Sequence, residues 1–177
     1  MSAVFEWNED GGASTGSPAK GTTRTTAVTQ ANFKNIDDVA TAYTSAPISA
    51  GTNSYPKFQF GKFSGSWNTL SSCKWSPHTA GTLATDCTLV GKVTSTYATP
   101  ATTALSGTTD FSSIVAVGSG ASVNFHGTGP EGASPTSTAS GGGTYYTQFL
   151  VSQLQVGVST PPGDIATITH SLQYIES

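Results

Sequence analysis

Apolar side chains recur at every second residue in several separate stretches of this chain, and that period of two favours β-strands over helices. The first stretch begins at Tyr55 and places Phe58 and Phe60 on one face, with polar residues and glycine between them. Two more stretches follow, over residues 67–75 and 87–93. Their spacing predicts an antiparallel meander of three consecutive strands.

The faces of these strands can be assigned from the same alternation. In the second stretch Trp67, Cys73 and Trp75 share one face, and Leu70 falls on the opposite one. Residues 76–81 contain proline and glycine and are expected to form the turn that ends this strand.

The C-terminal part of the chain contains two further strands. Leu154 and Val156 alternate with glutamines, so one face is expected to pack and the other to meet water. After a turn at residues 161–164, His170 lies on the apolar face of a last strand. Shorter strands are expected at residues 111–117 and 121–125, and a long exposed loop at 126–143, where glycines are dense.

The predicted fold class is all-β, as one antiparallel β-sandwich with jelly-roll-like connectivity over residues 30–177. The composition agrees, because 29 Thr and 24 Ser supply strand and turn residues while only 10% of the residues are charged. A 3-to-4 spacing over residues 33–43 fits either a short helix or a short strand with a turn.

Residues 1–29 are predicted to form an extended N-terminal arm. Their large apolar residues are few, and glycine, serine and threonine dominate the rest. Such a segment cannot bury enough surface to fold alone, so its order must come from another surface. Phe5 and Trp7 are the candidate partner-binding residues, because aromatic side chains dominate interface energetics.

Charge and hydropathy exclude several classes of protein. The net charge is −3, and the seven basic residues are scattered between Lys20 and Lys92, so nucleic acid is not expected as a partner. No apolar run is long enough to span a membrane, and no signal peptide is visible at the start. Cys73 and Cys87 are expected to be free thiols, although a hairpin disulfide is geometrically possible.

No residues form a recognisable catalytic motif, so the chain is predicted not to be an enzyme. His170 is expected to be a hydrogen-bonded core histidine, whereas His78 and His126 are expected in solvated loops. The acidic groups at residues 9–10 and 35–38 do not match a calcium loop and are expected to be solvated, so no metal or cofactor is predicted.

Aromatic residues raise one further alternative, a carbohydrate platform. Packing in the core is the stronger explanation for most of them, because the two tryptophans of residues 67–75 share a strand face. The residues in question are Trp67, Trp75, Tyr97, Tyr145, Tyr146 and Tyr174.

The chain resembles small structural β proteins of tailed phage virions. The likeness covers residues 30–100 and the last thirty, and it is a pattern of strands and turns that runs from Asn32-Phe33-Lys34-Asn35 and Pro47-Ile48, through Tyr55 to Ser66, Trp67-Asn68, Leu70 and Lys74-Trp75, to Leu154 and Leu172. The resemblance implies a virion protein made in the host cytoplasm, and it transfers no catalytic residues.

Three functions follow as hypotheses. The first is a capsid decoration or cement subunit that stabilises the phage head and binds the major capsid protein as a homo-oligomer. The second is a neck, tail or baseplate component that contacts other tail proteins or a host glycan. The loop at residues 126–143 would be either a host-facing tip or a contact with a neighbour. A secreted lectin or hydrolase is the hypothesis from another class.

Overall fold

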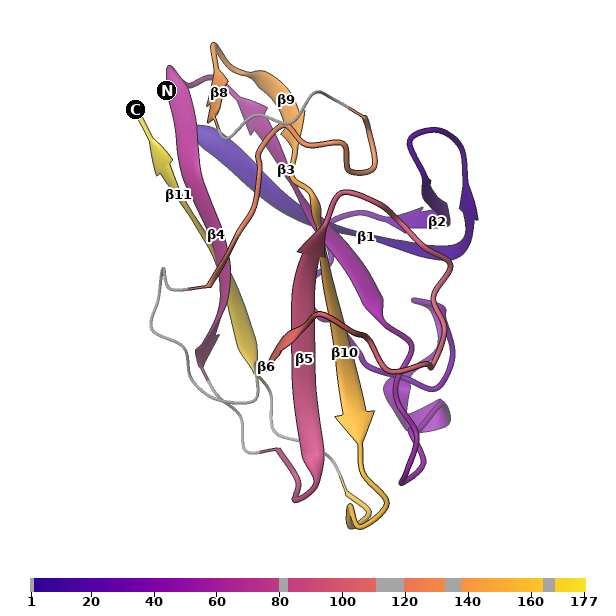
Figure 1. Ribbon diagram of the computed structural model, residues 1–177. Helices are drawn as coiled ribbons and strands as arrows, with labels where there is room; N and C mark the ends of the chain where they lie inside the picture. Colours follow the sequence, from indigo (N-terminus) through magenta and orange to yellow (C-terminus); the bar gives the residue numbers. More distant parts are fainter. Residues whose placement is uncertain (1, 80–82, 111–119, 133–137, 164–167) are drawn as a thin grey trace.

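The computed structural model describes residues 2–79, 83–110, 120–132, 138–163 and 168–177, which fold into two facing antiparallel sheets (Figure 1). The strands are β1 (Ala3–Thr15), β2 (Lys20–Thr25), β3 (Lys57–Gly65), β4 (Thr69–Thr79), β5 (Cys87–Thr94), β6 (Thr109–Asp110), β7 (Ala121–Ser122), β8 (Thr138–Ser140), β9 (Gly143–Tyr146), β10 (Phe149–Val156) and β11 (Thr169–Glu176). A single turn of 3-10 helix, η1 (Tyr43–Ser45), is the helical element among these residues.

The larger sheet has the strand order β2-β1-β3-β10-β5-β6. Its seventh strand, β9, pairs with β3 and is not part of this linear order. The smaller sheet has the order β11-β4-β7, and β8 also pairs with β4. Every strand pair is antiparallel. The predicted fold class, an all-β antiparallel sandwich, is therefore confirmed, and the jelly-roll connectivity stays a prediction.

The main core fills the space between the two sheets. Its centre is made of fully buried side chains from β3, β4, β5 and β10, with additions from the segments that follow β3 and β7. Among them are Phe63, Trp67, Leu70, Cys73, Trp75, Leu89, Phe125 and Leu150. Trp67 and Trp75 are only 3% and 2% exposed, as the core-packing interpretation predicted.

A second apolar cluster covers the other face of the larger sheet. Phe58 and Phe60 of β3 pack there against Phe149 and Val151 of β10, and Tyr97 lies over them from the chain after β5. The expectation that one face of β10 meets water is wrong. Gln153 is fully buried on that face, and its side-chain amide donates to the backbone oxygens of the covering segments.

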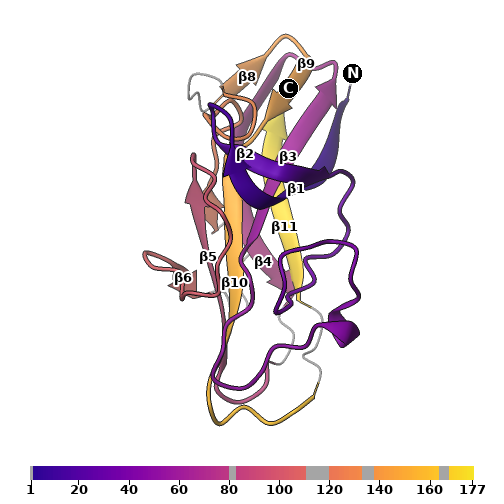
Figure 2. The same cartoon turned by 90° about the vertical axis from the view of Figure 1, so that its right-hand side faces the viewer.

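The predicted three-strand meander is also wrong, because β3 and β5 belong to the larger sheet and β4 to the smaller one. Figure 1 shows β4 and β11 to the left of β5 and β10, and in the turned view of Figure 2 β4 lies behind the larger sheet. Apolar alternation shows which face of a strand is buried, but it does not show which strand lies beside it. The connections from β3 to β4 and from β4 to β5 each cross to the opposite sheet instead of forming a hairpin. The predicted turn also starts too early, since β4 continues to Thr79.

Leu70 is buried in the inter-sheet core and not on the opposite face as predicted. The cause is a bulge in β4, where Ser72 has a φ of 55° and the register with β11 shifts by one residue. One extra residue reverses the alternation, so Leu70 faces the same side as Cys73 and Trp75.

The first half of the expected N-terminal arm is an internal strand of the domain. Residues 3–10 of β1 pair with β3 through eight consecutive positions, and residues 9–15 pair with β2. The hydrogen bonds and the apolar partners of this segment therefore come from the chain itself, and not from an outside surface.

Residues 33–42 form neither of the predicted alternatives, since bends connect them without helix or strand, and Tyr43 begins the 3-10 turn η1. The expected loop at 126–143 contains β8, and Gly127, Gly129 and Pro130 within it are buried. The strand expected at 111–117 lies outside the described residues. Within the described chain, no helix is both long and apolar enough to cross a membrane.

Candidate functional site

Phe5 and Trp7 lie on the same face of β1, at an open side of the sandwich. Both are partly buried against the inter-sheet core, with their ring centroids 5.1 Å apart and the Phe5 ring 5.2 Å from Phe63. Tyr174 of β11 contacts the same Phe63 ring at 4.9 Å. These contacts bring the two predicted anchor residues to the border between β1 and β11.

We call this border the β1–β11 seam and define it by Ala3, Phe5, Trp7, Leu172, Tyr174 and Glu176. Its two strands meet at the end of the molecule where both termini lie (Figure 1), and the backbone N–H of Ala3 donates to Oε1 of Glu176 at 3.1 Å. The aromatic rings of the seam are neither fully exposed nor fully buried.

Both strands of the seam offer a free edge. In the described chain β11 pairs with β4 alone, and β1 meets β2 only from Glu9 onward. Between residues 3 and 8 the outer edge of β1 has one backbone bond among the described residues, from the N–H of Val28 to the oxygen of Trp7 at 2.9 Å. Unpaired edges of this kind are sites where another chain can add.

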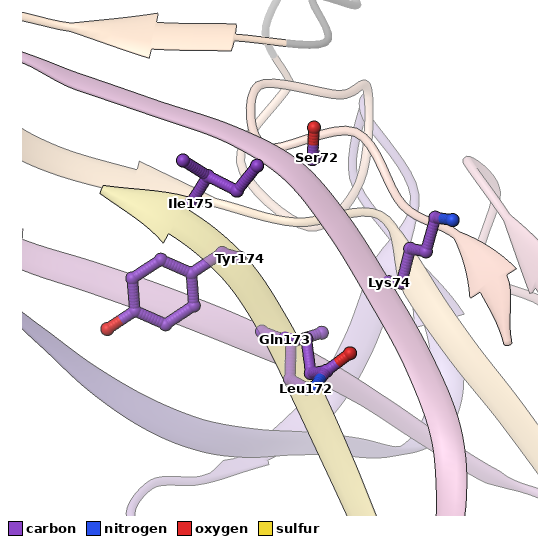
Figure 3. Close-up of a pocket in the computed structure, with 6 residues that line it drawn as sticks. All are labelled: Ser72, Lys74, Leu172, Gln173, Tyr174 and Ile175. Carbon is purple, nitrogen blue, oxygen red and sulfur yellow. The ribbon is translucent and has the colours of Figure 1, made fainter. Parts of the chain in front are cut away.

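A shallow hollow of about 470 Å³ lies on the smaller sheet and is shown in Figure 3. It is lined by Ser72 and Lys74 of β4 together with Leu172, Gln173, Tyr174 and Ile175 of β11. The Tyr174 ring points away from Ser72 and Lys74, toward the inter-sheet core (Figure 3). The side chains of Ser72, Lys74 and Gln173 point in different directions in Figure 3, so the polar groups of the hollow do not converge on one point.

A second pocket of about 290 Å³ lies between β9 and the segment at residues 126–132. His126, Tyr145 and Tyr146 supply its rings, and Glu131 supplies a carboxylate. His126 was expected in solvent, but it is half-buried and its ring lies 4.9 Å from that of Tyr145. The sequence did not reveal this pocket, because the lining residues of its two walls are 12 or more positions apart and share no motif.

His170 packs against an apolar neighbour as predicted, but its Nε2 lacks the predicted hydrogen bond among the described residues. Its ring meets the Trp75 indole edge-on at 5.2 Å, and its side-chain nitrogen Nε2 is enclosed. Burial lowers the pKa of His170 to about 4, so the imidazole is neutral at physiological pH. Nε2 has no serine or carboxylate as a hydrogen-bond partner among the described residues. The side chain of His78 lies outside the described residues.

Cys73 and Cys87 are free thiols, on strands of different sheets. Burial in the inter-sheet core raises the pKa of the Cys73 thiol, which keeps it protonated and unreactive. Within the described residues, no group of three or more His, Cys, Asp or Glu side chains could hold a metal ion.

The acidic residues near the N-terminus are structural, and the expectation that they are solvated is wrong for Glu9 and Asp10. Glu9 is buried and accepts from Lys57 Nζ at 3.0 Å and from Gln59 Nε2 at 3.2 Å. Asp10 is buried and accepts from Arg24 at 2.7 and 3.1 Å. Burial of such charges is tolerated because each one is paired.

The second acidic group, at residues 35–38, also binds within the chain. Asp37 accepts the backbone N–H of Gly12 at 2.7 Å. Asp38 accepts from the buried Lys34 at 2.6 Å and from Thr41, and these hydrogen bonds lower the pKa of Asp38 to about 2. These contacts use the carboxylates to fix loops of the chain.

Scans of protein-family models, of curated proteins and of solved structures found no match for this chain. Its function must therefore be argued from the seam and the pocket.

Proposed function

We propose that this chain is a structural subunit of a virus particle, and that it docks on a neighbouring virion protein through the β1–β11 seam. The observation that carries the proposal is the seam itself. Partly exposed aromatic rings lie there between two strand edges that are open among the described residues. Aromatic anchors beside free backbone groups suit the addition of a strand from a partner.

The chemistry of the described residues supports a structural role over catalysis. The buried charges are used in pairs within the fold, and His170 is neutral and packed against Trp75. The resemblance to phage virion proteins directs the proposal to a particle, with capsid decoration first and a neck, tail or baseplate position second. A second copy of the chain and the major capsid or tail proteins are the proposed partners.

The location on the particle can be tested directly. Virus particles are purified from the organism that encodes this chain, and its copies are counted by quantitative mass spectrometry and located by image reconstruction. We expect many ordered copies spread over the shell if the chain is a decoration subunit. A small ring at one vertex would select the neck or tail, and complete absence from the particles would contradict the proposal.

The seam is tested by Trp7→Leu. Leucine keeps an apolar side chain on the inter-sheet core but removes the ring edge that a partner would cover, so we expect docking on stripped particles to weaken by about tenfold or more. Tyr43→Leu is the matched control, because Tyr43 is an aromatic residue 48% exposed on η1 and away from both strands of the seam. Equal docking by the two variants would exclude the seam.

A further inference from the structure

The pocket beside β9 has ordered rings at its walls. The Tyr145 ring is 5.8 Å from the buried Trp67 ring, and its hydroxyl donates to the backbone oxygen of Ser140 at 3.2 Å. Tyr146 lies 6.1 Å from the fully buried Phe60. The two rings point to opposite faces of β9, because Tyr145 packs on the inter-sheet core and Tyr146 on the outer cluster. Tyr146 lies on the same side as Phe60 and Arg24, and its neighbours hold the ring before any ligand arrives, so it loses little entropy on binding.

The acidic group of the pocket is held just as firmly. Glu131 forms an ion pair with Arg24, whose guanidinium also binds Asp10 through two hydrogen bonds. The same guanidinium lies 4.8 Å from the centre of the Phe60 ring. Arg24 therefore fixes Glu131 at the rim, and the carboxylate, which only accepts hydrogen bonds, has lone pairs left for hydroxyl donors.

The glycines complete the wall. Gly127 and Gly132 line the pocket. The backbone of Gly132 has a φ of 60°, which residues with a side chain rarely adopt. A Cβ at Gly132 would lie 2.6 Å from Pro18 Cγ, so the segment at residues 126–132 is held close to the β1–β2 hairpin. The exposed hydroxyl of Thr144 stands on the opposite wall.

Size and charge narrow the class of ligand. A volume of about 290 Å³ lies at the lower end for small-molecule sites and suits one sugar ring. Arg24 is already shared by two carboxylates, so a phosphate or sulfate would find no free cation in it. Glu131 is the pocket's acidic residue and is neutralised, and the described residues offer no metal cluster, which argues against a cation.

We propose that this pocket binds a single neutral sugar ring, whose C–H face packs on the Tyr146 ring and whose adjacent hydroxyls donate to Glu131. Of the aromatic residues that the sequence suggested as a carbohydrate platform, Trp67, Trp75 and Tyr97 are core residues, whereas Tyr145 and Tyr146 are half-buried at the pocket. The proposal does not depend on a role in virus particles, because it concerns the isolated chain.

The test uses saturation-transfer NMR on the full chain with a fixed panel of glucose, galactose, mannose, N-acetylglucosamine and N-acetylgalactosamine. At about 10 mM sugar, a range in which weak single-ring binding is detectable, we expect saturation transfer to at least one of them. Glu131→Gln and Tyr146→Ala should each weaken that signal by about tenfold, since hydrogen bonds to charged groups and ring contacts carry the binding.

The matched control for Tyr146→Ala is Tyr43→Ala, which removes an equally large ring from an exposed site on η1. Glu131→Gln guards against a folding effect, because Arg24 keeps its two bonds to Asp10 in that variant. Transfer that is retained by Tyr43→Ala and lost in both pocket variants supports the site. Absence of transfer to every sugar of the panel, or equal transfer by Glu131→Gln, overturns it.

Discussion

The sequence predicted that the imidazole of His170 packs among apolar residues, but its protonation state could be inferred only from the structure. Its position among apolar neighbours predicted packing, and the ring does pack on Trp75. The missing information was the enclosure of Nε2, which lacks a hydrogen-bond partner among the described residues. An enclosed nitrogen without a partner favours the neutral ring over the charged one.

This enclosure predicts a pH dependence of stability. The pKa of His170 is lowered from 6.5 to about 4 by burial, so between these values the unfolded chain binds more protons than the folded chain. The free energy of unfolding should therefore fall as the pH drops from about 6.5 toward 4. Urea denaturation at pH 7.5 and 5 should show a smaller loss for His170→Phe than for the unchanged chain. His126→Gln is the control, and equal losses in all three proteins would contradict the prediction.

Ser72 carries the second prediction at this scale. Its backbone φ of 55° is unfavourable by about 1–2 kcal/mol for a residue with a Cβ, whereas glycine adopts this conformation without strain. Ser72→Gly should thus raise the free energy of unfolding by up to about 1 kcal/mol, and Ser72→Val should lower it by more than that. In Ser171, on the regular part of β11, the same two substitutions should have the opposite order. Thermal and urea denaturation measure both pairs, and a Ser72→Gly variant less stable than Ser72→Val would refute the bulge.

At the scale of elements, strands with apolar alternation could be predicted and the strand β1 could not. Strands β3, β5 and the C-terminal pair repeat large apolar residues at every second position, which reports burial directly. The centre of β1 reads Asn8, Glu9 and Asp10, yet all three are buried. Glu9 pairs with Lys57 and Asp10 pairs with Arg24. Both partners lie on other strands, so no local pattern in the sequence could show that these charges are paired.

The bulge in β4 and the pocket beside β9 could not be predicted from the sequence, for related reasons. The left-handed backbone conformation of Ser72 places Leu70 on the opposite face from the one predicted. Serine does not by itself indicate such a conformation. The pocket joins a glycine-rich segment to the strand β9, and sequence alone gives only the aromatic residues of one wall. Pairing between distant segments decides both features.

The place of β1 in the larger sheet leads to a test by truncation. Removing residues 1–29 deletes a strand that pairs with β3 over eight positions, together with Phe5 and Trp7, which pack half-buried against the inter-sheet core. Loss of one fully buried aromatic costs about 3–5 kcal/mol, so two half-buried rings and a whole strand are a large part of the about 5–15 kcal/mol that stabilises a domain. We expect the shortened chain to lose its near-UV circular dichroism, while removal of residues 1–2 alone leaves it unchanged. A folded, soluble protein from the longer truncation would restore the arm interpretation.

At the scale of the whole molecule, the larger sheet joins two apolar clusters into one structure. Strand β3 gives Phe63 to the inter-sheet core and Phe58 to the outer cluster, and β10 divides Leu150 and Val151 in the same way. Neither cluster can persist if these two strands separate. The chain should therefore unfold in one cooperative step, although its apolar residues form two separate groups.

Methyl NMR during a urea titration can follow each cluster separately. Leu70 lies in the inter-sheet core and Val151 in the outer cluster, so their methyl signals report the two sides of the larger sheet. We expect the native signals of both residues to disappear at the same urea midpoint, and Trp fluorescence, which reports the inter-sheet core through Trp67 and Trp75, to agree with them. A Val151 signal that is lost at clearly lower urea would mean that the covering segment around Tyr97 detaches first, and that the outer cluster is a separate unit of lower stability.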